Sequence, residues 1–248
     1  MDQTVLVPQV TRLRHETLRR TLTVLSTRRV SPTMLRLRLG GEELAGFVSA
    51  SPGDHFKLFV PDGAGGTVMR DYTPRRHDAV EGWLDIDFAL HDAGPATLWA
   101  LSANPGDRAE IGGPRGSQVI GGPIAAWVLI GDETALPSIA RRIEELPAGT
   151  PVTSSVAVPD PADEQAIKTD AAHRPHWVHR TDPCDTEGLL AAFRAIDLPP
   201  QSFVWIAAEA GIARKLRGAA LSRGVASEWM RAAGYWAAGQ VDASVRDL

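Results

Sequence analysis

The hydrophobic pattern of this 248-residue chain changes its period near residue 120. Before that point apolar residues alternate with polar ones, as in residues 35–39 (LRLRL) and 83–90 (WLDIDFAL), the period of a strand with one solvated face. Beyond it, short continuous apolar runs alternate with stretches of helical spacing. We therefore predict two domains, a β domain over residues 1–120 and an α/β domain over residues 121–248.

In the first half, a further strand is expected at residues 55–60 (HFKLFV). The segments between the expected strands, SPGD, PDGAGG, HDAGP and NPGD, have the residues of tight turns. Several short strands joined by such turns indicate a small antiparallel barrel, which we expect to have six strands.

In the second half, a strand buried on both faces is expected at residues 127–131 (WVLIG), followed by a helix whose apolar face includes Ala135, Ile139, Ile143 and Leu146. Further strands are expected at residues 151–158, 176–180, 203–209 and 234–236, and further helices at 189–196 and 211–222, the last ended by Gly224. We expect residues 159–175 to form a polar, mobile loop. This alternation predicts a doubly wound parallel sheet.

Composition excludes several classes of protein. The formal net charge of -4 argues against a nucleic-acid binder, and no apolar run approaches the ~18 residues of a membrane span. Residues 1–20 lack the pattern of a secretory signal, and the single cysteine, Cys184, leaves no intrachain disulfide or iron–sulfur cluster. The seven histidines form no spaced metal-binding set with that cysteine. We expect a monomeric cytoplasmic protein without a metal site.

The segment MRDYTPRR, residues 69–76, combines Arg70, Tyr72 and Thr73. A guanidinium pairs with phosphate, and a tyrosine ring stacks on a flat heterocycle with about 1 kcal/mol beyond area burial. Arg70 and Tyr72 share one face of a strand and Thr73 takes the other, so the strand must end or twist for all three to meet one ligand. By itself the segment is also explained by a surface strand end.

The same residues match the Arg-x-Tyr-Ser/Thr signature of the ferredoxin reductase-like flavoproteins. Over residues 84–117, and with colinear motifs over about residues 20–240, the chain resembles the siderophore-interacting protein family of FAD-binding ferric-siderophore reductases. The resemblance is carried by MRDYTPRR, the run DIDFALH, GPATLWA, the PGD turn, GPRGS, GDETALPSIARRIEELP, WIAAEAG and GYWAAG.

The resemblance implies a flavin site and assigns its residues. Those implied to hold the isoalloxazine and a nearby phosphate are Arg70, Asp71, Tyr72 and Thr73, with Thr73 at the flavin N5. Those implied to lie along the ribityl and adenosine side are Asp87, Phe88, Ala89 and His91. Those implied to meet the pyrophosphate are Gly94, Pro95, Ala96 and Thr97, because small residues at a helix start let backbone amides approach an anion. Trp99 is interpreted as a core residue, and His91 is also explained as a structural histidine.

The segment GDETALP, residues 131–137, stands where a nucleotide-binding domain passes from its first strand to its first helix, but it is not GxGxxG. Its acids favour a helix start and disfavour a phosphate. We predict that Gly131, Asp132, Glu209 and Ala210 face a nicotinamide nucleotide and that Thr134 reaches the FAD or that nucleotide. Capping of helices explains Asp132, Thr134 and Glu209 equally well.

The resemblance further implies that NADH, NADPH or ferredoxin supplies electrons, which pass through FAD to the Fe(III) of a siderophore and release Fe(II). Lys57, Arg76 and Arg246 are the candidates for contact with the siderophore, with Arg75 a further possibility. For each arginine a solvated surface position is the alternative. Two other functions stay open, a flavin or ferredoxin reductase with another acceptor and a non-catalytic flavin-binding carrier or sensor.

Overall fold

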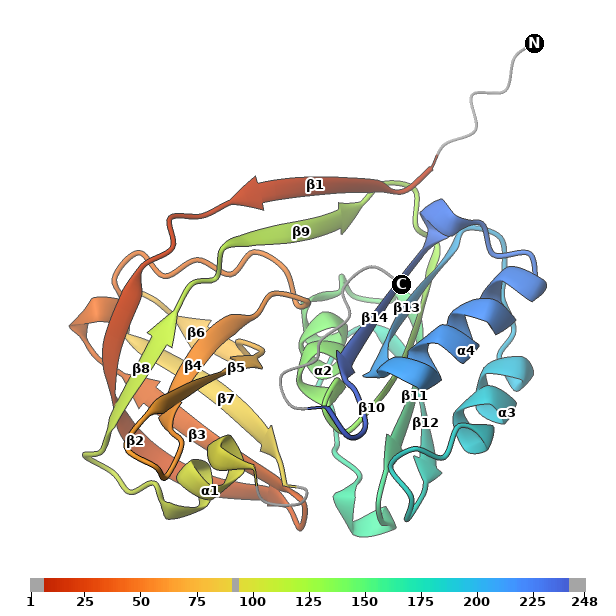
Figure 1. Ribbon diagram of the computed structural model, residues 1–248. Helices are drawn as coiled ribbons and strands as arrows, with labels where there is room; N and C mark the ends of the chain where they lie inside the picture. The colour runs from red at the N-terminus through yellow and green to blue at the C-terminus, as the bar shows by residue number, and fades with distance from the viewer. Residues whose placement is uncertain (1–6, 91–93, 241–248) are drawn as a thin grey trace. The chain divides into compact units, whose positions relative to one another are not determined.

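The structure is a computed structural model that describes residues 7–90 and 94–240 (Figure 1). The chain divides into two compact units. One is Arg12–Val119, and the other comprises the described residues of Met1–Thr11 and Ile120–Leu248. Each unit has its own hydrophobic core.

The first unit is built on a seven-stranded antiparallel sheet in the order β5-β4-β8-β2-β3-β7-β6. Its strands are β2 (Arg19–Ser31), β3 (Met34–Gly40), β4 (Phe56–Pro61), β5 (Thr67–Tyr72), β6 (Arg76–Asp78), β7 (Trp83–Ala89) and β8 (Arg108–Gly112). They curve around one interior, as a small barrel does (Figure 1). The antiparallel barrel-like architecture is confirmed, with seven described strands instead of six because the three residues of β6 add a short edge strand.

Four further elements complete this part of the chain. The helix α1 (Pro95–Ser102) packs against β3, β4 and β7, and the short 3-10 turn η1 (Glu42–Leu44) packs against β2. The strands β1 (Gln9–Arg14) and β9 (Gly116–Gly121) pair in a separate two-stranded sheet.

The alternating pattern of β7 places Leu84, Ile86 and Phe88 in the core, each with no exposed surface. The opposite face was expected to be solvated, but Asp85 and Asp87 are buried as well. The reason lies on the neighbouring strand β3, whose arginines cover both acids.

Two bidentate ion pairs join β3 to β7. Arg36 donates through Nε and Nη2 to Asp87 at 2.5 and 2.7 Å, and Arg38 donates in the same way to Asp85 at 2.7 and 2.8 Å. The members of each pair stand directly opposite one another in the strand register. A bidentate guanidinium–carboxylate pair fixes geometry as well as charge, which allows these acids to be buried.

The second unit contains a five-stranded parallel sheet in the order β12-β11-β10-β13-β14. Its elements are β10 (Ala126–Asp132), α2 (Leu136–Glu145), β11 (Pro151–Val158), η2 (Pro161–Asp163), β12 (Ala172–His179), α3 (Glu187–Ala195), β13 (Ser202–Glu209), α4 (Ala210–Ser222), η3 (Ser227–Trp229) and β14 (Met230–Trp236). The predicted alternation of strands and helices is confirmed. The expected loop at 159–175 is shorter than predicted, because it includes η2 and β12 begins at Ala172.

The strand order of this sheet reverses at β10. From β10 the chain adds β11 and β12 on one side, and then returns to add β13 and β14 on the other. In parallel sheets ligands bind beyond the carboxyl ends of the strands at such a reversal. The carboxyl ends of β10 and β13 are therefore the expected ligand-binding edge of this unit.

Within the described ranges, no helix has the length and hydrophobicity needed to cross a membrane.

Candidate functional site

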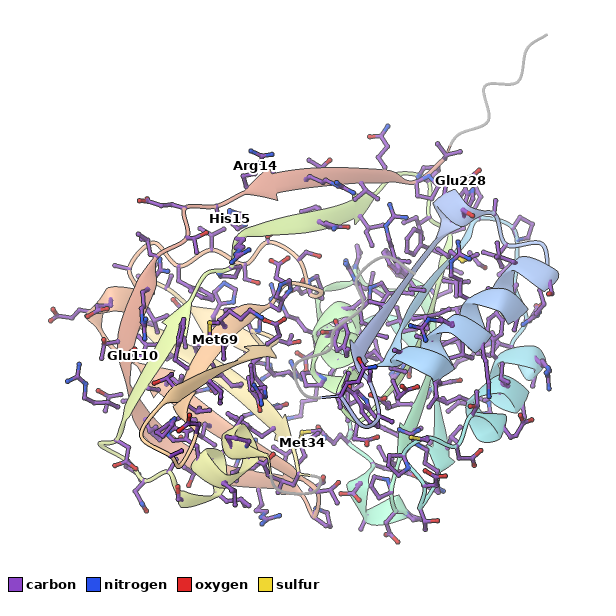
Figure 2. The ribbon with its side chains drawn as sticks, viewed as in Figure 1. Arg14, His15, Met34, Met69, Glu110 and Glu228 are labelled. Atoms are coloured by element: carbon purple, nitrogen blue, oxygen red, sulfur yellow. The ribbon has the colours of Figure 1, made fainter. Side chains whose placement is uncertain are left out.

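The end of β5 supplies the first group of predicted site residues. β5 ends at Tyr72, and Thr73 lies just beyond it with 8% of its surface exposed. The strand thus ends where the sequence required it to end or twist. Arg70 is half-buried, and its Nη1 donates to the backbone oxygen of the exposed Met69 at 2.8 Å (Figure 2).

Tyr72 begins a chain of aromatic contacts toward α1. Its ring centroid lies 4.4 Å from that of Phe88 on β7, and Phe88 lies 6.1 Å from Trp99 on α1. Phe88 is fully buried and Trp99 packs against the same core, which confirms the interpretation of Trp99 as a core residue. These contacts connect the end of β5 to α1 within one unit.

The Tyr72 phenol remains neutral over the physiological range. Burial raises the pKa of the phenol well above its usual value near 10, and the charge of Arg70 opposes part of that rise. The side chain therefore offers a half-buried neutral ring with a hydroxyl group, suited to stacking on a flat heterocycle.

The amino end of α1 has the features of an anion site. The backbone N–H groups of Ala96 and Thr97 precede the first intrahelical bond, from Leu98 N to Gly94 O at 3.0 Å. Among the described residues no side chain caps this end, and its first turn contains no acid. Pro95 opens the helix, and a Cβ built on Gly94 would meet no described atom within 4 Å. A phosphate group can therefore approach these amides.

Asp87 lies at the centre of a buried charge cluster. Both of its oxygens accept from Arg36, and Arg75 Nε lies 3.8 Å from Asp87 Oδ2. Arg75 is only 5% exposed, and its backbone N–H donates to Asp85 O at 3.0 Å. Asp87 thereby holds β7 and Arg75 together, whatever its contact with a cofactor. Ala89, the last residue of β7, is half-buried.

The predicted substrate residues have different surroundings. Lys57 on β4 forms an ion pair with Asp71 on β5, with Nζ 2.8 Å from Oδ1. Arg76 is exposed at the start of β6. His91 and Arg246, predicted for the cofactor and the substrate, lie outside the described residues.

The predicted nicotinamide residues gather at the strand-order reversal. Gly131 and Asp132 end β10, while Glu209 ends the adjacent β13 and Ala210 begins α4. A Cβ on Gly131 would lie 2.4 Å from Ala207 O, so close packing of β10 against β13 explains this glycine. Glu209 Oε2 accepts the N–H groups of Gly211 at 2.5 Å and Ile212 at 3.0 Å, so it caps α4.

Asp132 is fully buried and accepts four hydrogen bonds. Its Oδ1 accepts the backbone N–H and the hydroxyl of Thr134, at 3.0 and 2.5 Å. Its Oδ2 accepts Glu209 N at 2.9 Å and Trp236 Nε1 at 3.0 Å. Thr134 therefore uses its hydroxyl proton within the loop, and Asp132 joins the strand ends rather than facing outward.

Arg180 is the main site residue that the sequence interpretation did not select. Its Nη2 lies 3.1 Å from Glu133 Oε2 and 3.7 Å from Asp132 Oδ2, with only 2% of its side chain exposed. Loss of solvation raises the pKa of Glu133, Asp132 raises it further, and Arg180 opposes both. Arg180 ends the predicted strand 176–180 at the ligand-binding edge of the sheet, which was the available signal.

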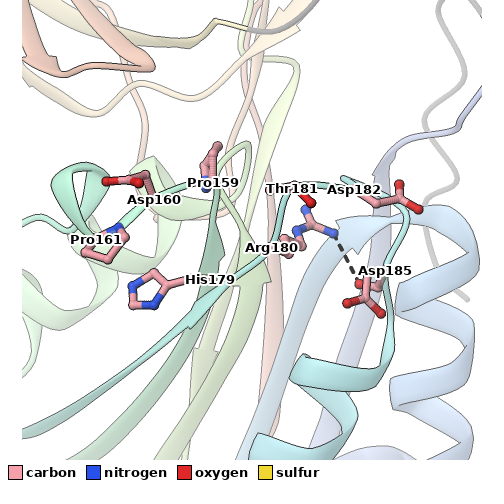
Figure 3. Close-up of a pocket in the computed structure, with 8 residues that line it drawn as sticks. All are labelled: Pro159, Asp160, Pro161, His179, Arg180, Thr181, Asp182 and Asp185. Carbon is pink, nitrogen blue, oxygen red and sulfur yellow. Dashed lines mark hydrogen bonds between the residues drawn. The ribbon is translucent and has the colours of Figure 1, made fainter.

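A pocket of about 550 Å³ opens beside Arg180 (Figure 3). Its lining residues are Pro159, Asp160, Pro161, His179, Arg180, Thr181, Asp182 and Asp185. They lie at or just beyond the carboxyl ends of β11 and β12. Across residues 7–90 and 94–240, no group of three or more His, Cys, Asp or Glu side chains could hold a metal ion.

Two independent features of the first unit are suited to binding FAD. The amino end of α1 presents uncapped backbone amides to an anion, and Tyr72 presents a neutral ring joined to α1 through Phe88. FAD contains both a pyrophosphate and a flat ring system. The site residues from β5 and α1 therefore suit both parts of that molecule.

Comparison with known proteins agrees with this geometry. Residues 124–239 match the family model of the siderophore-interacting proteins, and residues 23–67 and 63–118 match that of the siderophore-interacting FAD-binding domain. A relative from Escherichia coli K12, named NADPH-dependent ferric-chelate reductase, is 32% identical over 95% of this chain and 99% of its own. The ferric vibriobactin reductase ViuB of Vibrio cholerae is 32% identical over 65% of this chain and 66% of its own.

A solved structure supports the same relationship over nearly the whole chain. The crystal structure of a siderophore utilization protein from T. fusca superposes with a TM-score of 0.86 at 36% identity. It covers 95% of this chain and 98% of that one. The chain therefore belongs to the siderophore-interacting protein family.

Proposed function

We propose that this protein is an FAD-dependent reductase of ferric siderophores that takes its electrons from a nicotinamide nucleotide. The observation that carries the proposal is that the amino end of α1, which offers backbone amides to an anion, is joined to Tyr72 by the aromatic contacts through Phe88 and Trp99. Membership of the siderophore-interacting family, and the names of the ferric-chelate and ferric vibriobactin reductases among its relatives, support the substrate class.

The cofactor, when bound, supplies the chemistry of accepting two electrons from a nicotinamide and delivering them singly to Fe(III). The residues of this chain bind and orient it. The amides of Ala96 and Thr97 receive the pyrophosphate, Tyr72 stacks on the ring system, and Arg70 pairs with phosphate. Thr73, buried just beyond the strand end, directs its hydroxyl to the flavin N5. His91, Asp71, Asp87 and Ala89 are assigned to the same cofactor from the family resemblance alone.

At the second unit, the carboxyl edge of the parallel sheet receives the nicotinamide nucleotide. Asp132 gives this edge its rigidity, because its Oδ2 joins the ends of β10, β13 and β14. With its charge opposed by Arg180 and its lone pairs occupied, Asp132 repels an incoming phosphate less than an exposed carboxylate would. The main-chain groups of Gly131 and Ala210 are then the contacts offered to the nucleotide.

The substrate enters beside basic side chains of the first unit. Lys57 and Arg76 attract an anionic ferric siderophore, and Arg246 is a further candidate. Asp71 lowers the net charge around Lys57, since their side chains lie 2.8 Å apart. We further propose that the protein acts as a monomer in the cytoplasm, where its single cysteine fits a reducing compartment, and that ferredoxin is the alternative donor.

The experiment compares three proteins, wild type, Tyr72→Phe and Tyr72→Ala, after reconstitution with FAD. The wild type is expected to be yellow and Tyr72→Phe to retain flavin, because the ring is kept. Tyr72→Ala is expected to bind FAD about tenfold more weakly, since stacking and its buried area are lost. Equilibrium dialysis with FAD measures the dissociation constants.

Turnover is measured with the same preparations. Anaerobic stopped-flow mixing with NADH or NADPH should bleach the flavin band, and a ferric siderophore should restore it. Restoration by free flavin or ferredoxin but not by any ferric siderophore would indicate a reductase with another acceptor. Stable flavin binding without bleaching by any donor would instead indicate a carrier or sensor. A wild type that stays colourless would refute the proposal.

A further inference from the structure

The pocket of Figure 3 lies at a defined position in the sheet. Following β10, the first two strands along the chain are β11 and β12, and the pocket opens just past their carboxyl ends. Asp160 stands two residues beyond Val158, the last residue of β11. Its Oδ1 accepts the backbone N–H of Ala162 at 2.9 Å, which holds the side chain at the start of η2.

The sheet order makes this position informative. Counted along the chain from β10, the order β12-β11-β10-β13-β14 is 3-2-1-4-5, the order of a dinucleotide-binding sheet. In that arrangement an acidic side chain near the end of the second strand accepts the 2′-hydroxyl of the adenosine ribose. An arginine nearby instead accommodates a 2′-phosphate. The residue past the second strand here is Asp160.

Two basic side chains, Arg180 and His179, also line the pocket. Whether either is available to a ligand depends on the groups that it already contacts. Arg180 donates through Nη1 to the backbone oxygen of Pro183 and to that of Asp185, the second of which is drawn in Figure 3. Through Nη2 it donates to Glu133, and it balances the charge of Asp132. Turning Arg180 toward a ligand would leave two buried carboxylates without their counter-charge, which is costly.

His179, the remaining basic residue of the lining, pairs with Glu164, with Nε2 2.9 Å from Oε1. The acids of the lining, in contrast, keep acceptor capacity. Asp182 Oδ1 accepts from Cys184 N and Asp185 Oδ1 accepts from Glu187 N, one oxygen of each carboxylate in both cases. The lining therefore combines three carboxylates with two basic groups that are each already paired with an acid.

We propose that this pocket receives the adenosine ribose of the nicotinamide donor and that Asp160 makes the protein prefer NADH to NADPH. The proposal rests on the proposed function in one respect, that a nicotinamide nucleotide is the donor. A ribose 2′-hydroxyl donates a hydrogen bond to the carboxylate of Asp160. A 2′-phosphate has no proton to donate at neutral pH and meets the charges of Asp160, Asp182 and Asp185. The preference would distinguish this chain from its Escherichia coli relative, whose name specifies NADPH.

The test measures binding without turnover. Isothermal titration of the flavin-loaded protein at low ionic strength compares ADP-ribose with 2′-phospho-ADP-ribose, two fragments that differ only in the 2′-phosphate. We expect ADP-ribose to bind about tenfold more tightly or better, because each carboxylate within a few ångströms of a phosphate contributes repulsion. The ratio of kcat/KM for NADH and NADPH should change in the same direction.

Two matched variants locate the effect. Asp160→Asn removes the charge and keeps the oxygen that accepts from Ala162, and it should reduce the preference severalfold. Asp170→Asn makes the same charge change on an exposed residue just before β12, at the opposite edge of the sheet, and it should leave the preference unchanged.

Equal binding of the two fragments, tighter binding of the 2′-phosphorylated one, or binding of neither would overturn the proposal. An unchanged preference in Asp160→Asn would overturn the role of Asp160. Flavin retention and reoxidation by ferric siderophores are measured separately. A protein that reduces ferric siderophores with either nucleotide equally would therefore refute this inference and leave the proposed function standing.

Discussion

The indole N–H of Trp236 donates to Oδ2 of Asp132 at 3.0 Å, and the same oxygen accepts the backbone N–H of Glu209 at 2.9 Å. These three residues are the last of β14, β10 and β13. One carboxylate oxygen therefore joins the carboxyl ends of three parallel strands at the edge where the nucleotide is proposed to bind. The contact gives both acid and indole a structural role that their positions in the sequence do not reveal.

Replacing Trp236 with phenylalanine should destabilise the α/β unit. The substitution keeps most of the ring but removes the donor to a buried carboxylate, so we expect the free energy of unfolding to fall by about 1–3 kcal/mol. Urea denaturation of the full chain, followed by circular dichroism, measures the change. Trp229→Phe, a matched change at a half-buried tryptophan of η3, is the control. An equal loss in both variants would contradict the assignment.

Two glycine substitutions should have opposite effects on stability. In Gly131→Ala the new Cβ would lie 2.4 Å from Ala207 O and 2.8 Å from Ala135 Cβ, so strain should cost about 1–3 kcal/mol. In Gly218→Ala the new Cβ meets nothing within 4 Å on the exposed face of α4, and the higher helix propensity of alanine should add about 0.5–1 kcal/mol. Thermal unfolding of both variants beside the wild type tests the prediction. A Gly131→Ala protein as stable as the wild type would show that β10 and β13 can separate locally.

The ion pair of Lys57 and Asp71 allows the proposed attraction of the siderophore to be tested by removing either charge. If Lys57 attracts an anionic ferric siderophore, Lys57→Gln should lower kcat/KM severalfold and Asp71→Asn should raise it, because the acid offsets the lysine charge. Both effects should shrink as salt is added. Flavin content is measured in each variant, because Asp71 is also a predicted cofactor residue. Opposite changes in kcat/KM at unchanged flavin content support the prediction, and parallel changes contradict it.

The raised pKa of Glu133 predicts a dependence of stability on pH. Burial, followed by the neighbouring Asp132, raises the pKa of this carboxyl from its usual value near 4.5, so the folded protein holds the proton more tightly than the unfolded chain. The Glu133 contribution to the free energy of unfolding must therefore decrease as pH rises from the usual value through the raised one. Glu133→Gln removes this contribution.

The measurement is the difference in free energy of unfolding between Glu133→Gln and wild type across that pH range. The difference should grow in favour of the variant as pH rises, and then level off above the folded pKa. The same substitution at the exposed Glu228 should give a flat difference (Figure 2). A flat or falling difference for Glu133→Gln would contradict the prediction.

Much of the fold could be predicted from the spacing of apolar residues, because that spacing depends only on the geometry of the strand or helix in which the residues lie. The run at 127–131 lies in a strand buried on both faces, and the spacing from Ala135 to Ile143 follows the buried side of α2. The expected solvated face of β7 failed for a different reason. Alternation identifies residues that share a face, but Asp85 and Asp87 are covered by arginines 47 and 51 positions away.

The candidate site shows the same division. The end of β5 at Tyr72 and the helix start at Gly94 follow from neighbouring residues, and both were predictable. The partners of Asp132 were not, since Trp236 is 104 positions away and reaches Asp132 only once β14 joins the sheet. Asp160 lies in a segment of mixed charge, and the sequence alone did not indicate a role for it. The strand order of the sheet places it just past the end of the second strand, where a ribose is recognised.

The two arginine–aspartate pairs between β3 and β7 also restrict how the chain can misfold. A slip of β7 by two residues would keep Leu84, Ile86 and Phe88 facing inward, so hydrophobic burial alone tolerates it. The slip would place Arg36 opposite Asp85, or Arg38 opposite Asp87, and leave one arginine and one aspartate without their counterparts. The two ion pairs on one face of the sheet thus favour the correct register of β7 against β3 while the barrel is forming. They disfavour the register shifted by two residues, which buries the same apolar side chains.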